Sequence, residues 1–292
     1  MRLIPSIIQP GHPDFAALNR IRAGIFARVG GSEKLAEHFP GLVREAIDFV
    51  LDPVRTARTR ITELDNIEKT FVGLKIEHMV RDMLDVPKGL RDLVIDGIDV
   101  DIKNTIGNTW MIPPETFRTE EACLLVASEE STHRCWMGLL VARTAYLNAP
   151  NRDDKRSIAS GAFQNIMWLV DAAPYPQSRW ASINMDRFRE IRKIRGGTKR
   201  AVAFFSENLL LPVHRDVIQS LLLQHDFMKR VRKNGGARDI LKTRGIALLS
   251  GIYDSGLIQK LHISPISREE TIAVAPRNKL EEGLMRTMGV IV

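Results

Sequence analysis

The stretch from Asp92 to Lys103 holds the residues of this chain with the clearest chemical potential. Asp101 and Lys103 are separated by one residue, and Asp92 precedes them on the same stretch. In an extended strand, residues two apart point to the same side. A carboxylate and an ammonium placed in this way can hold a divalent cation and orient a water or a phosphate under attack. The Asp…Asp-x-Lys pattern is typical of metal-dependent nucleases that hydrolyse phosphodiesters.

The residues between these groups favour an extended conformation. The β-branched members of the run are Val94, Ile95, Ile98, Val100 and Ile102. β-Branched side chains fit the pleated surface of a sheet, and Gly97 supplies a turn or bulge within the run. An alternating charged strand is also what the solvated face of an ordinary sheet shows. The pattern alone therefore leaves a purely structural strand open.

A further acidic residue precedes the strand on an expected helix. Residues 66–84 carry apolar side chains at helical spacing, and Glu77 lies within them. Glu77 can supply a third carboxylate to a cation held by Asp92 and Asp101, although its spacing fits a surface glutamate nearly as well. The residues alone therefore predict a cation shared by Asp92 and Asp101, with Lys103 acting on the water or the phosphate, and they leave open whether Glu77 joins them.

Positive charge is concentrated in the second half of the chain. The whole chain carries 42 Lys and Arg against 35 Asp and Glu, a net charge of +7. Residues 171–292 contain 21 basic against 12 acidic residues, whereas residues 1–170 contain 21 against 23. This asymmetry favours one part that holds metal and another that grips a polyanion. Basic faces also occur on proteins that never touch nucleic acid.

The sequence gives no indication of a membrane or secreted protein. No apolar run approaches the ~20 residues of a membrane span, and the N-terminus lacks the apolar core of a secretion signal. Cys123 and Cys135 lie in apolar runs without the spacing of a zinc site. Buried free thiols in a reducing cytoplasm are therefore expected.

The order of elements predicts two domains. In residues 1–170, helical periodicity is followed by short apolar runs at residues 122–127 and 135–142. This order predicts an α/β (α+β) domain with a mixed central sheet flanked by helices. Residues 171–178 contain two prolines and predict a linker. Residues 179–292 are mostly helical, and their short helices followed by a strand predict a winged helix-turn-helix domain.

A basic segment in the second half is the predicted contact with nucleic acid. We expect a helix over residues 227–233, with Phe227 and Val231 as apolar anchors. Basic side chains beside such anchors suit a phosphate-facing or groove-facing helix. The candidate DNA-binding residues are Lys229, Arg230, Arg232, Lys233 and Arg238. A solvated basic helix is the alternative interpretation.

Together these segments resemble the NaeI-type type II restriction endonucleases, within the PD-(D/E)xK nuclease superfamily. The resemblance runs in the same order along nearly the whole chain, and the Asp/Lys motif gains specificity from the segments around it. The matching segments are Glu68–Thr70 with Glu77, Asp92–Lys103, Trp110–Glu115, Met137–Leu139, Asn151–Arg152 with Lys155–Arg156, and Met228–Arg238.

The resemblance implies a site-specific nuclease of the bacterial cytoplasm. It implies catalysis by Glu77, Asp92, Asp101 and Lys103 with Mg²⁺, on double-stranded DNA. It also implies a second, CAP-like helix-turn-helix domain that binds another copy of duplex DNA, and a homodimer acting on a palindromic site. Two alternatives remain open: a MutH-like repair nuclease that nicks one strand, and a DNA-binding regulator with an inactive nuclease half.

Overall fold

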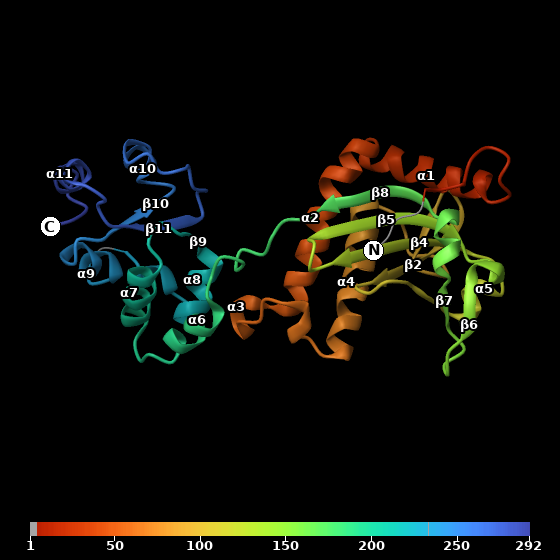
Figure 1. The fold of residues 1–292 in the computed structure, drawn as a ribbon, viewed down its shortest axis with the longest axis horizontal. Coiled ribbons are helices and arrows are strands. Elements are labelled where there is room, and N and C mark those ends of the chain that lie inside the picture. Colours follow the sequence, from red (N-terminus) through yellow and green to blue (C-terminus); the bar gives the residue numbers. More distant parts are fainter. Residues whose placement is uncertain (1–4, 233) are drawn as a thin grey trace. The chain divides into compact units, whose positions relative to one another are not determined.

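The computed structural model describes residues 5–232 and 234–292 and divides the chain into two compact units (Figure 1). Unit 1 combines the described residues up to Leu51 with Arg60–Gln177. Unit 2 combines Asp52–Thr59 with Ser178–Val292. Because the short segment Asp52–Thr59 belongs to unit 2, the chain passes between the units three times.

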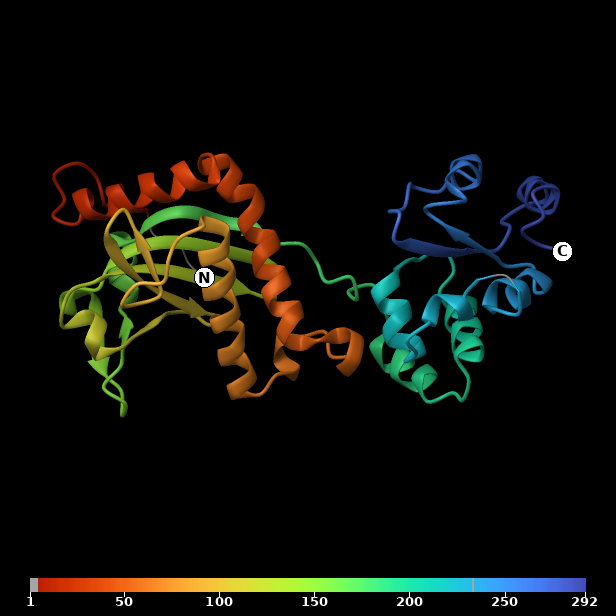
Figure 2. The same cartoon turned by 180° about the vertical axis from the view of Figure 1, so that it is seen from behind.

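Unit 1 is built on a five-stranded mixed sheet with the strand order β1-β2-β4-β5-β8 (Figure 2). The strands are β1 (Leu93–Ile95), β2 (Ile98–Thr105), β4 (Ala122–Glu129), β5 (Arg134–Val141) and β8 (Met167–Pro174). β2 and β4 are parallel, whereas every other neighbouring pair is antiparallel. The predicted mixed central sheet is confirmed.

Helices cover one face of this sheet (Figure 2). They are α1 (Phe15–Val29), α2 (Ser32–Leu51) and α4 (Asn66–Leu84). α4 begins with a capping box in which Asp65 accepts a hydrogen bond from the Glu68 N–H, which fixes its start. Its buried residues Val72, Ile76 and Val80 join the core beneath the sheet. The predicted helix over residues 66–84 is confirmed.

The opposite face of the sheet is covered by smaller elements. They are β3 (Met111–Ile112), α5 (Pro114–Phe117), η2 (Thr144–Tyr146), β6 (Leu147–Pro150), β7 (Arg156–Ile158) and η3 (Ser160–Asn165), whereas η1 (Ile61–Glu63) joins the cluster on the helix-covered face. Cys123 and Leu125 of β4 pack among them, while Leu124 and Val126 face the helices. β4 is therefore buried on both faces, and its hydrogen bonds to β2 fix β2 against this buried strand.

A tight hairpin joins β1 to β2. Its turn consists of Asp96 (φ 50) and Gly97 (φ 80), and this pair of left-handed residues suits a two-residue hairpin. Arg28 of α1 donates to the Asp96 carboxylate at 3.0 Å, which fastens the turn to the helix layer. The turn expected at Gly97 is present, and it lays β1 beside the first half of β2.

The predicted linker at residues 171–178 is wrong for its first half. β8 continues to Pro174, which pairs with Arg134 of β5, and Tyr175 is buried. The Tyr175 N–H also donates to the His133 carbonyl at 3.0 Å. Proline is tolerated here because β8 is an edge strand. The prolines in this segment predict a loop, although the first half of the segment is the end of a strand.

Unit 2 contains a three-stranded antiparallel sheet in the order β10-β11-β9. The strands are β9 (Pro212–His214), β10 (Ala247–Ser250) and β11 (Glu270–Val274). The helices are α3 (Pro53–Thr56), α6 (Met185–Arg192), α7 (Gly197–Glu207), α8 (Arg215–Leu222), η4 (Phe227–Arg230), α9 (Ala237–Thr243), α10 (Ser255–Lys260) and α11 (Lys279–Thr287). No described helix of either unit is long and apolar enough to cross a membrane.

The sheet of unit 2 has an apolar cluster on each face. Leu248 and Ala273 pack with α6 to α9, whereas Leu249 and Val274 pack with α10 and α11. α3 joins the first cluster, where the buried Ser220 of α8 donates its hydroxyl to the Pro53 carbonyl at 3.1 Å. The segment inserted from the first half of the sequence is thus part of the core of unit 2.

The predicted basic helix over residues 227–233 is wrong. Only the short 3-10 helix η4, Phe227–Arg230, forms there, although Phe227 and Val231 are buried as predicted. Asn234 (φ 68) adopts a left-handed conformation, and the Val231 carbonyl accepts the Arg238 N–H at 3.1 Å. The chain therefore turns back into α9 before a second helical turn is complete. Lys233 lies outside the described residues.

Candidate active site

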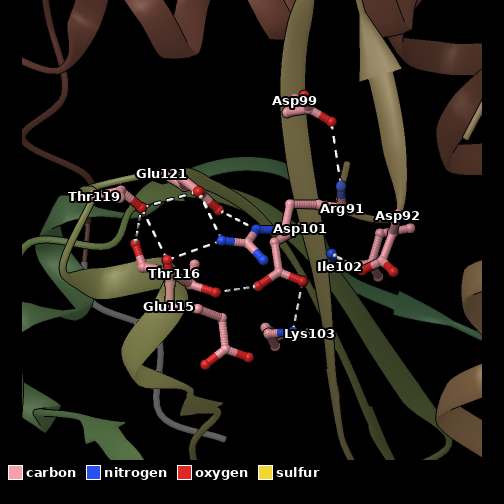
Figure 3. A network of polar contacts seen from close by, with 10 residues as sticks. All are labelled: Arg91, Asp92, Asp99, Asp101, Ile102, Lys103, Glu115, Thr116, Thr119 and Glu121. Carbon is pink, nitrogen blue, oxygen red and sulfur yellow. Dashed lines mark hydrogen bonds and ion pairs between the residues drawn. The ribbon is translucent and has the colours of Figure 1, made fainter. Parts of the chain in front are cut away.

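The Asp101 and Lys103 side chains meet on one side of β2 (Figure 3). Lys103 Nζ lies 2.6 Å from Asp101 Oδ1, and Asp101 is only 4% exposed. The intervening Ile102 points the other way, into the helix-covered core. The period of two along a strand thus produces the predicted carboxylate–ammonium pair, held by a buried β-branched neighbour.

Asp92 reaches the same strand from the position just before the start of β1. Antiparallel pairing stops at Leu93 and Val100, which leaves the next backbone groups of β2 without a strand on that side. The Asp92 carboxylate takes this place, because its Oδ2 accepts the Ile102 N–H at 2.7 Å. Burial is the main cause that raises the pKa of Asp92, and the neighbouring Asp101 adds to it. The two aspartates therefore share one poorly hydrated site.

Glu77 completes this group from α4. Burial raises the pKa of Glu77 to about 7, and the negative charges of Asp92 and Asp101 add to the rise while Lys103 opposes it. Glu77 follows the buried Ile76, so it lies at the side of α4 rather than on its solvated face. The structure thus brings all four predicted catalytic residues into one electrostatic cluster.

The chemistry of this donor set fits a hard divalent cation. Three carboxylates share the cluster with one ammonium, and burial, together with the neighbouring negative charges, raises the pKa values of Glu77 and Asp92. Oxygen donors of this kind suit Mg²⁺. Within residues 5–232 and 234–292, no three acidic, histidine or cysteine side chains already form a metal-binding group.

Sequence reasoning missed Thr116, which contacts Asp101 directly. The Thr116 hydroxyl donates to Asp101 Oδ2 at 2.6 Å, and Thr116 is fully buried (Figure 3). It lies on α5, a single helical turn that follows Pro113 and has Pro114 at its first position. A double proline does mark a helix start, but nothing in the sequence indicates that this turn packs against Asp101.

Arg91 was also missed, although it is adjacent to Asp92. Its guanidinium binds the Glu121 carboxylate at 2.6 and 2.9 Å and donates to the Glu115 carbonyl at 2.9 Å (Figure 3). The hydrogen bonds from Arg91 hold the pKa of Glu121 below its usual range. This ion pair links the segment before β1 to α5 and to the start of β4.

Comparison with known proteins decides the family. The profile of the restriction endonuclease NaeI family matches residues 31–283. The chain belongs to this NaeI family. It is also 28% identical over 279 residues to the type II restriction enzyme NaeI of Lentzea aerocolonigenes, covering 92% of this chain and 86% of that enzyme. The predicted family and enzyme class, a type II site-specific endonuclease, are confirmed.

In this member of the NaeI family, the predicted DNA-binding residues of unit 2 differ in their surroundings. Lys229 and Arg232 are exposed, and Arg230 is exposed with its Nε donating to Gln224 at 3.0 Å. Arg238 is engaged within the unit, because it donates to the Leu248 carbonyl at 2.8 Å and lies 2.6 Å from the Asp254 carboxylate. Its guanidinium therefore has a structural role already.

A cavity of about 970 Å³ adjoins these residues in unit 2 of the NaeI-family chain. Arg232 and Arg238 line it, together with Arg215 and Arg268, which sequence reasoning did not single out. Tyr253, 82% exposed after β10, also lines it. Arg215 and Arg268 lie far apart in sequence and outside any basic run, so only the fold reveals that they share a surface.

Proposed function

We propose that this chain hydrolyses phosphodiesters of double-stranded DNA at specific sites and depends on Mg²⁺ for this reaction. The observation that carries the proposal is the contact between Asp101 and Lys103 beside Asp92 on β2. The carboxylates around this pair attract a cation. The Lys103 ammonium remains partly accessible, with 22% of the Lys103 side chain exposed. This combination suits the attack of water on a phosphate diester.

Asp92, Asp101 and Glu77 are the proposed ligands of the cation. When bound, Mg²⁺ supplies charge neutralisation and a more acidic water. Burial already raises the pKa of Glu77 to about 7, so the ionised form that binds metal becomes abundant near neutral pH. The Ile102 N–H holds one oxygen of Asp92 and leaves the other for a ligand.

Lys103 is the proposed partner of the attacking water and of the scissile phosphate. Its Nζ donates to Asp101 at 2.6 Å, and an ammonium has further protons to donate. It therefore orients a water or a non-bridging phosphate oxygen while remaining anchored to Asp101. The buried strands beside β2 hold this arrangement in place before DNA arrives.

For unit 2 we propose a winged helix-turn-helix domain. Three features support it: the element order α7, β9, α8, α9, β10, β11, the antiparallel sheet, and the position of β11 between β9 and β10. We propose Lys229, Arg230 and Arg232 as its contacts with DNA phosphates, because these side chains are exposed. Arg238 supports this surface from within through Asp254.

The partners proposed for the chain follow from its family. We propose that it acts as a homodimer on a palindromic duplex and that unit 2 binds a second copy of duplex DNA. Two subunits cut the two strands of such a site because two-fold symmetry relates the strands of a palindrome. We also propose a bacterial cytoplasm as the location of this reaction, since restriction requires access to incoming DNA.

Cleavage of a supercoiled plasmid tests the reaction. The protein is incubated with plasmid DNA in Mg²⁺ and in EDTA, on DNA with and without host modification. We expect discrete linear fragments in Mg²⁺ only, and Lys103→Ala should cut at least about a hundredfold more slowly while still binding DNA. Lys34→Ala is the matched control, because Lys34 is exposed on α2.

The products distinguish the proposal from its alternatives. Nicked circles that never become linear would instead favour a strand-nicking repair nuclease. Retarded DNA without any product, in every metal and on every DNA, would favour a regulator. Full activity of Lys103→Ala would refute the role proposed for the Asp101–Lys103 pair.

A further inference from the structure

The Asp101 carboxylate has a donor on each oxygen. Lys103 Nζ lies 2.6 Å from Oδ1 and the Thr116 hydroxyl lies 2.6 Å from Oδ2 (Figure 3). A hydroxyl that donates to an ionised carboxylate makes a short and strong hydrogen bond. Rotation of the carboxylate about its own axis would break both contacts. Thr116 therefore determines, together with Lys103, which lone pairs Asp101 presents.

Stabilising its own helix does not explain this threonine. The N-cap position of α5 is occupied by Pro113, and the Thr116 hydroxyl donates to Asp101 on another element. A threonine in a helix commonly returns its hydroxyl to a backbone carbonyl one turn earlier. Thr119, in the turn that follows α5, makes the same kind of bond with the Glu115 carbonyl at 2.9 Å. The fully buried Thr116 instead directs its hydroxyl at Asp101 of β2.

The surrounding network holds Thr116 against the strand. Arg91 donates to the Glu115 carbonyl at 2.9 Å and binds Glu121 through two hydrogen bonds. The Thr119 hydroxyl contacts the Glu121 carboxylate at 2.9 Å, which closes the network (Figure 3). One set of contacts therefore joins α5 to the segment that carries Asp92, so both aspartates depend on a common frame.

We propose that Thr116 is a positioning residue that orients Asp101 for the divalent cation of the phosphodiester reaction. This inference rests on the proposed function, because it concerns a ligand of that same site. Partners that orient a metal ligand commonly change metal affinity or activity by about 10- to 100-fold when they are removed. Thr116 touches Asp101 and does not itself belong to the group that meets the substrate.

Thr116→Val tests the proposal, because it removes the hydroxyl and nearly preserves the volume of the side chain. The first readout is the Mg²⁺ concentration that half-saturates the thermal shift of the DNA-free protein. The second is the Mg²⁺ concentration that half-saturates plasmid cleavage. We expect both to rise about tenfold, with DNA binding in EDTA unchanged and with most of the wild-type affinity retained by Thr116→Ser.

Two further variants keep the test decisive. Thr105→Val is the control, because it removes the hydroxyl of a buried threonine on β2 that accepts the Gly107 N–H and does not contact Asp101. It should leave both half-saturating Mg²⁺ concentrations, the midpoints, unchanged. Thr116→Ala replaces Thr116→Val if the valine variant fails to fold. Unchanged midpoints in a folded variant that lacks the hydroxyl would overturn the role of Thr116, even if its melting temperature in EDTA falls. A wild-type protein that neither binds Mg²⁺ nor cuts DNA would overturn the proposed function itself.

Discussion

Replacing Glu77 by glutamine removes a carboxylate that the metal-free protein accommodates poorly. Burial raises the pKa of Glu77 from 4.5 to about 7, so its protonated form is favoured in the folded state. The resulting penalty is absent below pH 4.5, grows between pH 4.5 and about 7, and is complete above that range. Glutamine resembles the protonated glutamate at every pH.

The expected gain follows from this difference in pKa. At ~1.4 kcal/mol per pKa unit, the full penalty is about 3 kcal/mol. Because the Glu77 side chain is only partly buried, solvent screening reduces this to about 1–2 kcal/mol. In EDTA at about pH 8, Glu77→Gln should therefore be more stable than wild type by that amount, and the gain should nearly vanish at pH 4.5.

Urea denaturation at both pH values measures the free energy of unfolding of each protein. Excess Mg²⁺ at the higher pH should reverse the order, because the cation stabilises the ionised glutamate that the variant lacks. Glu45→Gln is the matched control, since Glu45 is exposed on α2. A Glu77→Gln protein with no gain in EDTA at about pH 8 would refute the placement of Glu77 in a poorly hydrated acidic cluster.

Two further outcomes test the core of unit 1. Arg143→Met should destabilise the protein by about 3 kcal/mol in urea, because Asp14, 1% exposed and 2.6 Å from Arg143, would lose its cation; a loss under about 1 kcal/mol would contradict this account. Burial raises the pKa values of Cys123 and Cys135, so neither thiol should react with a disulfide reagent in the folded protein at about pH 8. Both should react in urea, and rapid labelling without urea would contradict the buried placement.

The sequence predicts the parts of the site that depend on local periodicity. A period of two places Asp101 and Lys103 on one side of a strand, and a period of 3.6 defines the helix that carries Glu77. Each periodicity arises within a single strand or helix, so it can be recognised in the sequence without knowledge of the fold. The sequence also predicts that Asp92 can reach the same ion, but the hairpin that brings it beside β2 is a finding of the structure.

The missed features depend on contacts between elements. Thr116 reaches Asp101 only because α5 packs on β2, and Arg91 finds Glu121 across the sheet. Residues 171–174 have the composition of a loop yet pair with β5 as an edge strand. In residues 227–233 the apolar spacing of a helix is present, but the left-handed Asn234 and the bond from Arg238 end the turn early.

The segment Asp52–Thr59 means that the gene cannot be divided into two halves that each encode a complete fold. A fragment containing residues 178–292 alone would lack α3, and the buried Ser220 hydroxyl would lose its acceptor, the Pro53 carbonyl. Cleavage of the backbone at Gln177 would leave residues 178–292 attached to the rest of the protein only through noncovalent contacts with this segment, such as the hydrogen bond from Ser220 to the Pro53 carbonyl. Units 1 and 2 therefore have to be exchanged or truncated together.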